Sequence, residues 1–139
     1  MFFGRHSHTI DDKNRVRIPK EYRNQLGANI LIGQGVNKCL YIYSAEVFEK
    51  KNAQFYGVDP FDVKKQYAMG EFISSYSNPE IDSQGRIILP KDLKNYAGIT
   101  KNIVTRGVLD RIEIWSEEEL AKKDASAGSE FVEMLADKG

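Results

Sequence analysis

The chain has little that would place it outside the cytoplasm or in a membrane. Its 139 residues include a single cysteine, Cys39, so an intrachain disulfide framework is excluded. The first residues lack the apolar segment and small-residue cleavage site of a secretory signal. No apolar run approaches the roughly 20 residues that span a bilayer. We therefore expect a soluble cytoplasmic protein with no membrane partner.

The motifs of common enzyme classes are also missing. The sequence contains no phosphate-binding P-loop, no Gly-x-Ser-x-Gly elbow and no His-Glu-x-x-His helix. His6 and His8 lie on one face of an expected strand, but a zinc site needs three or four ligands, and the spacing assembles no others. Cys39 is interpreted as a small strand residue because no base is placed beside it. We expect no metal, no cofactor and no enzymatic activity.

Net charge of one sign is absent overall but present locally. Twenty lysines and arginines balance twenty aspartates and glutamates. Residues 1–25 nevertheless hold six basic against three acidic residues, a net +3, whereas residues 112–139 hold three against eight, a net −5. With 41% hydrophobic and 29% charged residues the chain is globular, and its basic end is compatible with an anionic partner.

The chain contains one unit twice. Residues 82–91 repeat residues 11–20 at an offset of 71, and both copies retain an Asp, an Arg four places later, and Pro-Lys. After a one-residue insertion the offset becomes 72, and Ile-Tyr-Ser at 42–44 matches Ile-Trp-Ser at 114–116. Each unit spans about 45 residues, which is too few for a domain that folds stably by itself.

Within each unit the pattern predicts a short strand, a short helix and a hairpin. Val16 and Ile18 alternate with polar residues, and a proline follows where a helix can begin. The expected hairpins pair 30–32 with 40–43 and 102–105 with 111–115, and the expected helices cover 45–57, 60–71, a segment starting after Ser116, and 129–138. We expect these helices to pack on the repeat core, in a fold that is mainly β with α (α+β).

The repeated aspartates are typical of sharp turns. Asp11 and Asp82 are placed to accept hydrogen bonds from the backbone that follows, with the Arg four places on as an ion-pair partner. Gly85 permits a left-handed residue in the second turn, and Asn14 tolerates it in the first. An enzyme using the two aspartates as paired carboxylates is disfavoured, because carboxylates already occupied by a turn are poor general bases.

The strand pattern also allows a second role for the motif arginine, in which it faces outward toward an anion instead of only pairing with its Asp. If Val16 and Ile18 face the core, then Arg15 and Arg17 share the opposite face, with Lys13 nearby. The second copy has only one basic residue in this stretch. The first copy is therefore expected to dominate any contact with an anion.

The doubled string Asp-x-x-Asn/Gly-Arg-x-x-x-Pro-Lys resembles the MraZ family of bacterial transcription regulators, and beyond it the AbrB-type swapped-hairpin DNA-binding domains. The similarity extends over residues 1–120 and includes Met-Phe-Phe-Gly at 1–4 and His-Thr-Ile-Asp-Asp-Lys at 8–13. It implies two tandem AbrB-like units whose hairpins interlock into one pseudo-twofold β-barrel. The units are expected at 1–49 and 75–121, with a helical connection at 50–74 and a C-terminal helix or tail at 122–139.

The resemblance also implies binding of double-stranded DNA through the two turns. In this family the Asp-x-x-Gly-Arg motif carries that role, and it maps to Asp11, Asn14 and Arg15 and to Asp82, Gly85 and Arg86. We expect Arg15 and Arg86 to reach base edges or phosphates, with phosphate contacts from Lys13, Arg17 and Lys20 and an auxiliary one from Arg5.

The expected function is sequence-specific regulation of the cell-division and cell-wall gene cluster by a nucleoid-associated protein. The resemblance implies a homo-oligomer, in the form of a ring, on tandem direct repeats of promoter DNA. The alternative is an antitoxin-like interaction module in which the acidic segment 112–139 binds a protein partner.

Overall fold

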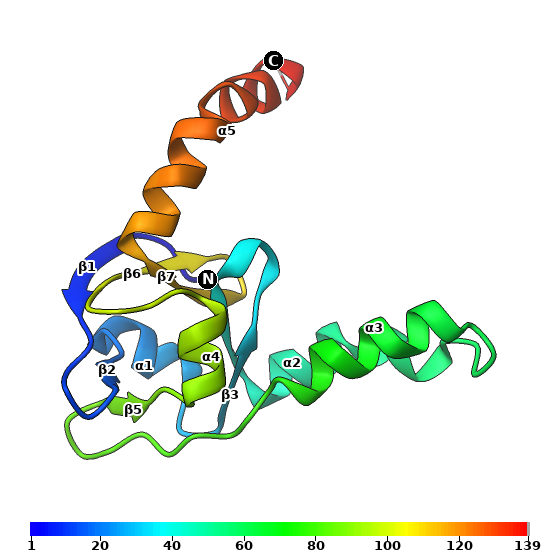
Figure 1. Cartoon of the computed structure of the whole chain (residues 1–139), viewed down its shortest axis with the longest axis horizontal. Coiled ribbons are helices and arrows are strands. Elements are labelled where there is room, and N and C mark those ends of the chain that lie inside the picture. Colours follow the sequence, from blue (N-terminus) through cyan, green and yellow to red (C-terminus); the bar gives the residue numbers. More distant parts are fainter. Residues whose placement is uncertain (139) are drawn as a thin grey trace.

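The computed structural model describes residues 1–138 and places their strands in two sheets (Figure 1). A five-stranded antiparallel sheet has the order β1-β6-β7-β4-β3, and a separate two-stranded ribbon pairs β2 with β5. The strands are β1 (Arg5–Thr9), β2 (Arg15–Arg17), β3 (Ile30–Gln34), β4 (Leu40–Ser44), β5 (Arg86–Ile88), β6 (Asn102–Val108) and β7 (Arg111–Ser116). The helices are α1 (Lys20–Leu26), α2 (Ala45–Lys51), α3 (Val63–Ser74), α4 (Lys91–Tyr96) and α5 (Glu117–Lys138), with short 3-10 helices η1 (Val36–Lys38) and η2 (Ala53–Gly57).

Both copies of the repeat fold in the same order of strand, short helix and hairpin. In the first copy α1 starts after Pro19 and is closed by Gly27, whose φ of 76° lies in the left-handed region that favours glycine. In the second copy α4 starts after Pro90, and Gly98 follows its end at φ 65°. The strands predicted from the alternating pattern, and the short helices predicted between Pro and Gly, are confirmed.

The two copies share one hydrophobic core. Strands β4 and β7 pair at the centre of the large sheet, where Leu40 lies opposite Ile114 and Ile42 opposite Ile112. In the ribbon, Val16 of the first copy lies opposite Ile87 of the second. The fully buried aliphatic side chains come from both copies: Val16, Ile18, Ile30, Ile32, Leu40, Ile42, Ile87, Leu89, Ile103, Ile112 and Ile114. Because the core is built jointly, neither copy buries its apolar face alone.

The mixed α+β class is confirmed, but the expected closed barrel is not. Strands β1 and β3 are the two edges of an open sheet, and among the strands of residues 1–138 the ribbon strands pair only with each other. Each ribbon strand has three residues. Pro19 and Pro90 follow two residues later, and their missing N–H groups prevent the ladder from continuing.

The connecting and terminal helices differ in detail from the sequence prediction. The helix expected at 45–57 is divided into α2 and η2 at Asn52, and the one expected at 60–71 is α3, capped by Asp62. Ser44 caps α2 as predicted, since its Oγ accepts a hydrogen bond from the Val47 amide at 3.2 Å. The two helices expected beyond residue 116 form one continuous 22-residue helix, α5. Gly128 does not interrupt it, because an internal glycine costs only about 1 kcal/mol.

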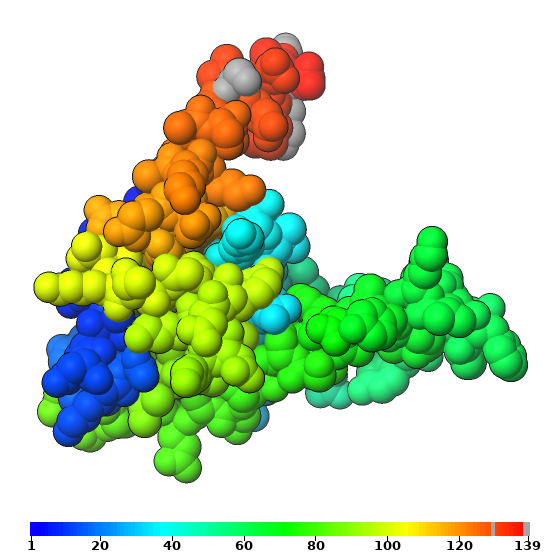
Figure 2. All heavy atoms as spheres, in the orientation of Figure 1, coloured from blue at the N-terminus to red at the C-terminus, as the bar shows by residue number. Residues whose placement is uncertain are grey.

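The prediction that these helices pack on the repeat core is wrong for much of their length. Figure 1 shows α2 and α3 extending together to one side of the core, and α5 extending away in another direction. The space-filling view shows both as projections beyond the core (Figure 2). The exposed large apolar side chains of these projections, with η2 and the turn before α3 included, are Tyr56, Phe61, Val63, Tyr67, Ile73, Phe131, Val132, Met134 and Leu135. Only the first turns of α5 are anchored, with Leu120 buried against β-strand residues such as Trp115.

An apolar groove lies between α2, η2 and α3. Its volume is about 650 Å³, and its lining includes Phe48, Phe55, Met69 and Ile73. No helix among residues 1–138 combines the length and apolar composition needed to cross a membrane.

Candidate nucleic-acid interface

The first motif turn is built around the carboxylate of Asp11. Its Oδ1 accepts hydrogen bonds from the backbone N–H groups of Lys13 at 3.0 Å and Arg15 at 2.8 Å. Its Oδ2 accepts one from Arg15 Nε at 2.7 Å. Asn14 adopts the left-handed φ of 60° that closes the turn. The turn predicted from the sequence is confirmed, including the Asp–Arg ion pair.

The second motif turn has the same geometry around Asp82. Its Oδ1 accepts from the amides of Gln84 and Arg86, both at 2.9 Å, and its Oδ2 from Arg86 Nε at 2.8 Å. Gly85 has a φ of 76°. The first turn therefore has the same geometry as the second, although Asn14 stands at the position where the second turn has Gly85.

Both aspartates are held in their ionised form. Hydrogen bonds from the backbone amides of Arg15 and Arg86 lower the pKa of Asp11 and Asp82, respectively, below the ordinary aspartate value. Partial burial acts in the opposite direction, and the guanidinium groups add to the lowering. At neutral pH each turn therefore contains a carboxylate that orients one arginine.

The ribbon brings the arginines of both copies onto one face. Arg17 lies directly opposite Arg86, and Arg15 lies opposite Ile88. Because side chains alternate along a strand, these four residues share the face opposite the buried Val16–Ile87 pair. Arg17 is exposed and has no ion pair among residues 1–138. The charge of Arg86 is already offset by Asp82, so Arg17 is the arginine of this face that can take an external anion as its partner.

The surroundings of the ribbon are basic and the far end of the molecule is acidic. Residues 11–23 and 82–94 together hold eight lysines and arginines against five acidic residues, a net +3. The residues of α5 hold three lysines against seven acidic residues, a net −4. Figure 1 places the ribbon and the free end of α5 at opposite ends of the view. The charge asymmetry read from the sequence is therefore also an asymmetry in space.

The remaining predicted contacts divide into two groups. Lys13 and Lys20 are exposed beside the ribbon, the first in the turn and the second at the start of α1. Arg5 lies on β1, in the other sheet, and forms a 3.4 Å ion pair with Asp124 of α5. The structure therefore does not bring Arg5 to the arginine face.

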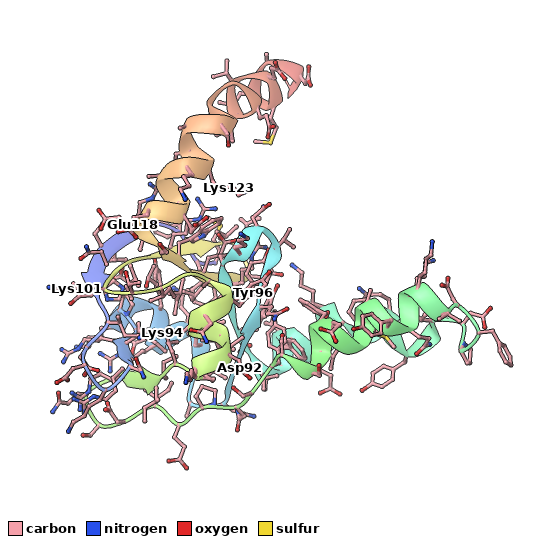
Figure 3. All side chains as sticks on the ribbon, in the orientation of Figure 1. Asp92, Lys94, Tyr96, Lys101, Glu118 and Lys123 are labelled. Carbon is pink, nitrogen blue, oxygen red and sulfur yellow. The ribbon has the colours of Figure 1, made fainter. Side chains whose placement is uncertain are left out.

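Two cations near the turns were missed in the sequence. Lys94 of α4 donates a hydrogen bond to Asn14 Oδ1 at 2.8 Å, and the guanidinium of Arg23 of α1 lies against Gly85. Figure 3 labels Lys94 on α4, between Asp92 and Tyr96. Since Arg23 and Lys94 are 71 residues apart, the repeat offset itself was the signal that could have identified them.

The histidines and the cysteine have structural partners. His6 Nε2 lies 2.6 Å from Glu21 Oε1, and His8 Nε2 lies 2.6 Å from Thr105 Oγ1. Burial raises the pKa of the Cys39 thiol to about 12, which leaves it unreactive at neutral pH. Among residues 1–138 no group of three or more His, Cys, Asp or Glu side chains is arranged to hold a metal ion.

Comparison with known proteins finds a family and named relatives that match most of the chain. The family model described as "MraZ protein, putative antitoxin-like" matches residues 1–67 and 72–131. The chain belongs to the MraZ family. A protein of Clostridium tetani named transcriptional regulator MraZ is 41% identical over 122 residues, which covers 85% of this chain and 83% of that protein. A protein of the same name from Acetivibrio thermocellus is 32% identical over 99% of this chain and 96% of its own length. Another from Clostridium acetobutylicum is 37% identical over 91% of this chain and 89% of its own length.

Proposed function

We propose that this chain is a sequence-specific DNA-binding transcription regulator that contacts DNA through the β2–β5 ribbon. The observation that carries the proposal is the outer face of the ribbon, where Arg15, Arg17 and Arg86 from two distant segments lie together. The names of the relatives, which are regulators rather than enzymes, support the same class. A cytoplasmic, nucleoid-associated location follows from this proposal.

The chemistry of the face suits a DNA groove. The major groove of B-DNA admits a two-stranded ribbon, and arginine pairs with guanine through two parallel donors. Because Asp11 and Asp82 occupy the Nε donors, the terminal nitrogens of Arg15 and Arg86 can point outward while the side chain stays oriented. Arg17, Lys13 and Lys20 are placed for phosphates, which position a protein without reading sequence.

The proposal extends to the fold and the assembly. The shared core and the pairing of β2 with β5 support an AbrB-like interlock of the two copies. The exposed apolar side chains of α5 and of the α2–α3 projection support a homo-oligomer, which we propose is a ring on tandem direct repeats in the promoter of the cell-division and cell-wall genes. Each subunit can then bind its DNA repeat only weakly, because the linked subunits of an oligomer can strengthen overall DNA binding by about a hundredfold or more.

Arg17→Ala tests the interface most directly. Arg15 and Arg86 also hold their turns, so replacing them changes the fold as well as the charge, whereas Arg17 is exposed without an ion pair among the described residues. Fluorescence anisotropy with a labelled duplex of the DNA upstream of its own gene should show about three- to tenfold weaker binding. The slope of log affinity against log salt should fall by about one.

Lys64→Ala is the matched control. Lys64 is also exposed but lies on α3, away from the ribbon. It should leave both affinity and salt slope unchanged. Equal losses from the two variants, or none from Arg17→Ala, would show that the ribbon is not the DNA interface.

A second candidate function is an antitoxin-like module that binds a protein partner. The acidic and apolar outer half of α5, together with the description of the family model, favours it. Binding of a basic partner that is abolished by substitutions in α5, with DNA affinity that barely changes with salt, would support this candidate over the first.

A further inference from the structure

Residues 14 and 85 occupy the junction between the two copies of the repeat. The backbone carbonyl of Asn14 accepts a hydrogen bond from the Leu89 amide of the other copy at 2.8 Å. The carbonyl of Gly85 accepts one from the Ile18 amide at 2.9 Å. Ile18 and Leu89 are equivalent at the offset of 71, so the two contacts are reciprocal. Each motif turn is therefore attached to the opposite copy.

A cation on the opposite helix completes each junction in a different way. Lys94 Nζ reaches across from α4 and donates to the side-chain oxygen of Asn14 at 2.8 Å. At the equivalent place the guanidinium of Arg23 fills the space beside Gly85, where a Cβ atom would collide with it. Arg23 is fixed there because its Nε donates to the Ile18 carbonyl at 3.0 Å.

The two combinations are matched pairs. An asparagine has an acceptor within reach of a lysine ammonium, whereas a glycine leaves room for the larger planar guanidinium. Any side chain at position 85 would displace Arg23, and a glycine at position 14 would remove the partner of Lys94. The asparagine that replaces glycine in the first turn is thus explained by the lysine that replaces arginine on the opposite helix.

We propose that Lys94 and Arg23 are positioning residues of the DNA interface, each of which holds the motif turn of the opposite copy and so orients the arginine next to it. The inference rests on the proposed function. Asn14 precedes Arg15 and Gly85 precedes Arg86, so the two junctions set how these arginines lie relative to each other on the ribbon. Holding them before binding removes an ordering cost from association.

A double-mutant cycle on Asn14 and Lys94 tests this role. We expect Asn14→Gly and Lys94→Met each to weaken binding of the labelled upstream duplex by about fivefold, because either change releases the first turn. The double variant should bind no more weakly than the singles, since both remove the same contact. Asn14→Gly combined with Lys94→Arg recreates the pairing of the second copy and should restore affinity to within about twofold.

Lys91→Met is the matched control for the exchange measurement alone, because Lys91 is exposed on the same helix and makes no side-chain contact of this kind among the described residues, but is the repeat equivalent of Lys20. Hydrogen exchange of the amides of Lys13 and Arg15 supplies a readout that does not depend on DNA. These amides are bound to Asp11, and they should lose protection in Lys94→Met but not in Lys91→Met. Protection of the Gln84 and Arg86 amides should be unchanged in both.

The outcomes separate this inference from the proposed function. Additive losses in the cycle, together with a salt slope reduced by about one in Lys94→Met, would mean that Lys94 contacts a phosphate directly and would overturn the positioning role. Unchanged exchange in Lys94→Met would overturn it as well. If the unmodified protein fails to bind the duplex, the proposed function is lost, whereas the exchange result still decides whether Lys94 holds the turn.

Discussion

At the scale of single residues, Asp11 and Asp82 reconcile two interpretations of the motif arginines. From the sequence, an arginine paired with its aspartate and an arginine directed outward were alternatives. In the structure Arg15 gives its Nε to Asp11 while its side chain lies on the exposed face of the ribbon. The guanidinium has five donors in a planar group, so one can be held while others remain available. The turn and the ion pair were predictable because they depend on neighbours within five residues.

The pH dependence of stability should report the Asp11 turn. The pKa of Asp11 is lower in the folded protein than in the unfolded chain. The stability that its ionised carboxylate contributes is therefore complete above the unfolded pKa of about 3.9, and it is lost as the pH falls through the folded pKa. Asp11→Asn should therefore be less stable than the unmodified protein at pH 7, and the difference should stay constant down to about pH 4 and shrink as the pH falls further. Urea denaturation across this range measures it.

The neighbouring Asp12 provides the control for that series. Asp12 is exposed and makes no side-chain hydrogen bond within residues 1–138, so Asp12→Asn should match the unmodified protein at every pH. A stability difference for Asp11→Asn that stays constant from pH 7 to pH 3 would contradict the assignment.

At the scale of elements, the β6–β7 hairpin contains a polar cluster that the alternating pattern did not reveal. Glu113 is 3% exposed and accepts hydrogen bonds from Arg106 Nε at 2.8 Å and Trp115 Nε1 at 2.9 Å, with Arg111 Nη2 at 2.8 Å. Burial alone would raise the pKa of Glu113, but the Trp115 and Arg106 hydrogen bonds and the nearby positive charge lower it overall. Glu113 therefore belongs to the interior and not to the acidic surface inferred for residues 112–139.

Glu113→Gln should be strongly destabilising. The change leaves the partly buried Arg106 without its counter-charge and leaves Arg111 with only the Asp110 carboxylate at 3.9 Å; removing one partner of a buried pair costs about 3 kcal/mol. The exposed Glu117 at the start of α5 is the control, and its replacement by Gln should change stability by less than about 0.5 kcal/mol. Urea denaturation of the two variants makes the comparison, and equal stabilities would show that the cluster is not a stabilising element.

At the scale of the whole molecule, the chain is a core with two projections, of which α5 is acidic and both carry exposed apolar side chains. The outer half of α5 leaves Phe131 61% exposed and Leu135 52% exposed. Exposed apolar side chains gathered on one part of a helix favour a partner surface that covers them. We expect that surface to belong to another copy of the chain.

Phe131→Ser with Leu135→Ser should lower the particle mass measured by sedimentation toward that of a single 15.8 kDa chain. Both side chains are exposed and lie beyond the core, so thermal unfolding of the core should be unaffected. Glu130→Gln with Glu133→Gln changes polar positions on the same part of the helix and should preserve the mass. A mass that is unchanged by the apolar substitutions would place the oligomer contacts elsewhere.

The sequence alone determined the doubled unit, the Asp–Arg turns, the Pro-to-Gly helices and the alternating strands. These features follow from local rules, since turns, caps and alternation depend on hydrogen bonds and side-chain directions within a few residues. The tertiary structure decided that the copies share a core, that Arg17 lies opposite Arg86, and that Lys94 and Arg23 reach the turns of the opposite copy. These pairs are about 60 to 80 residues apart in the chain, and they meet because neither copy can bury its apolar face alone.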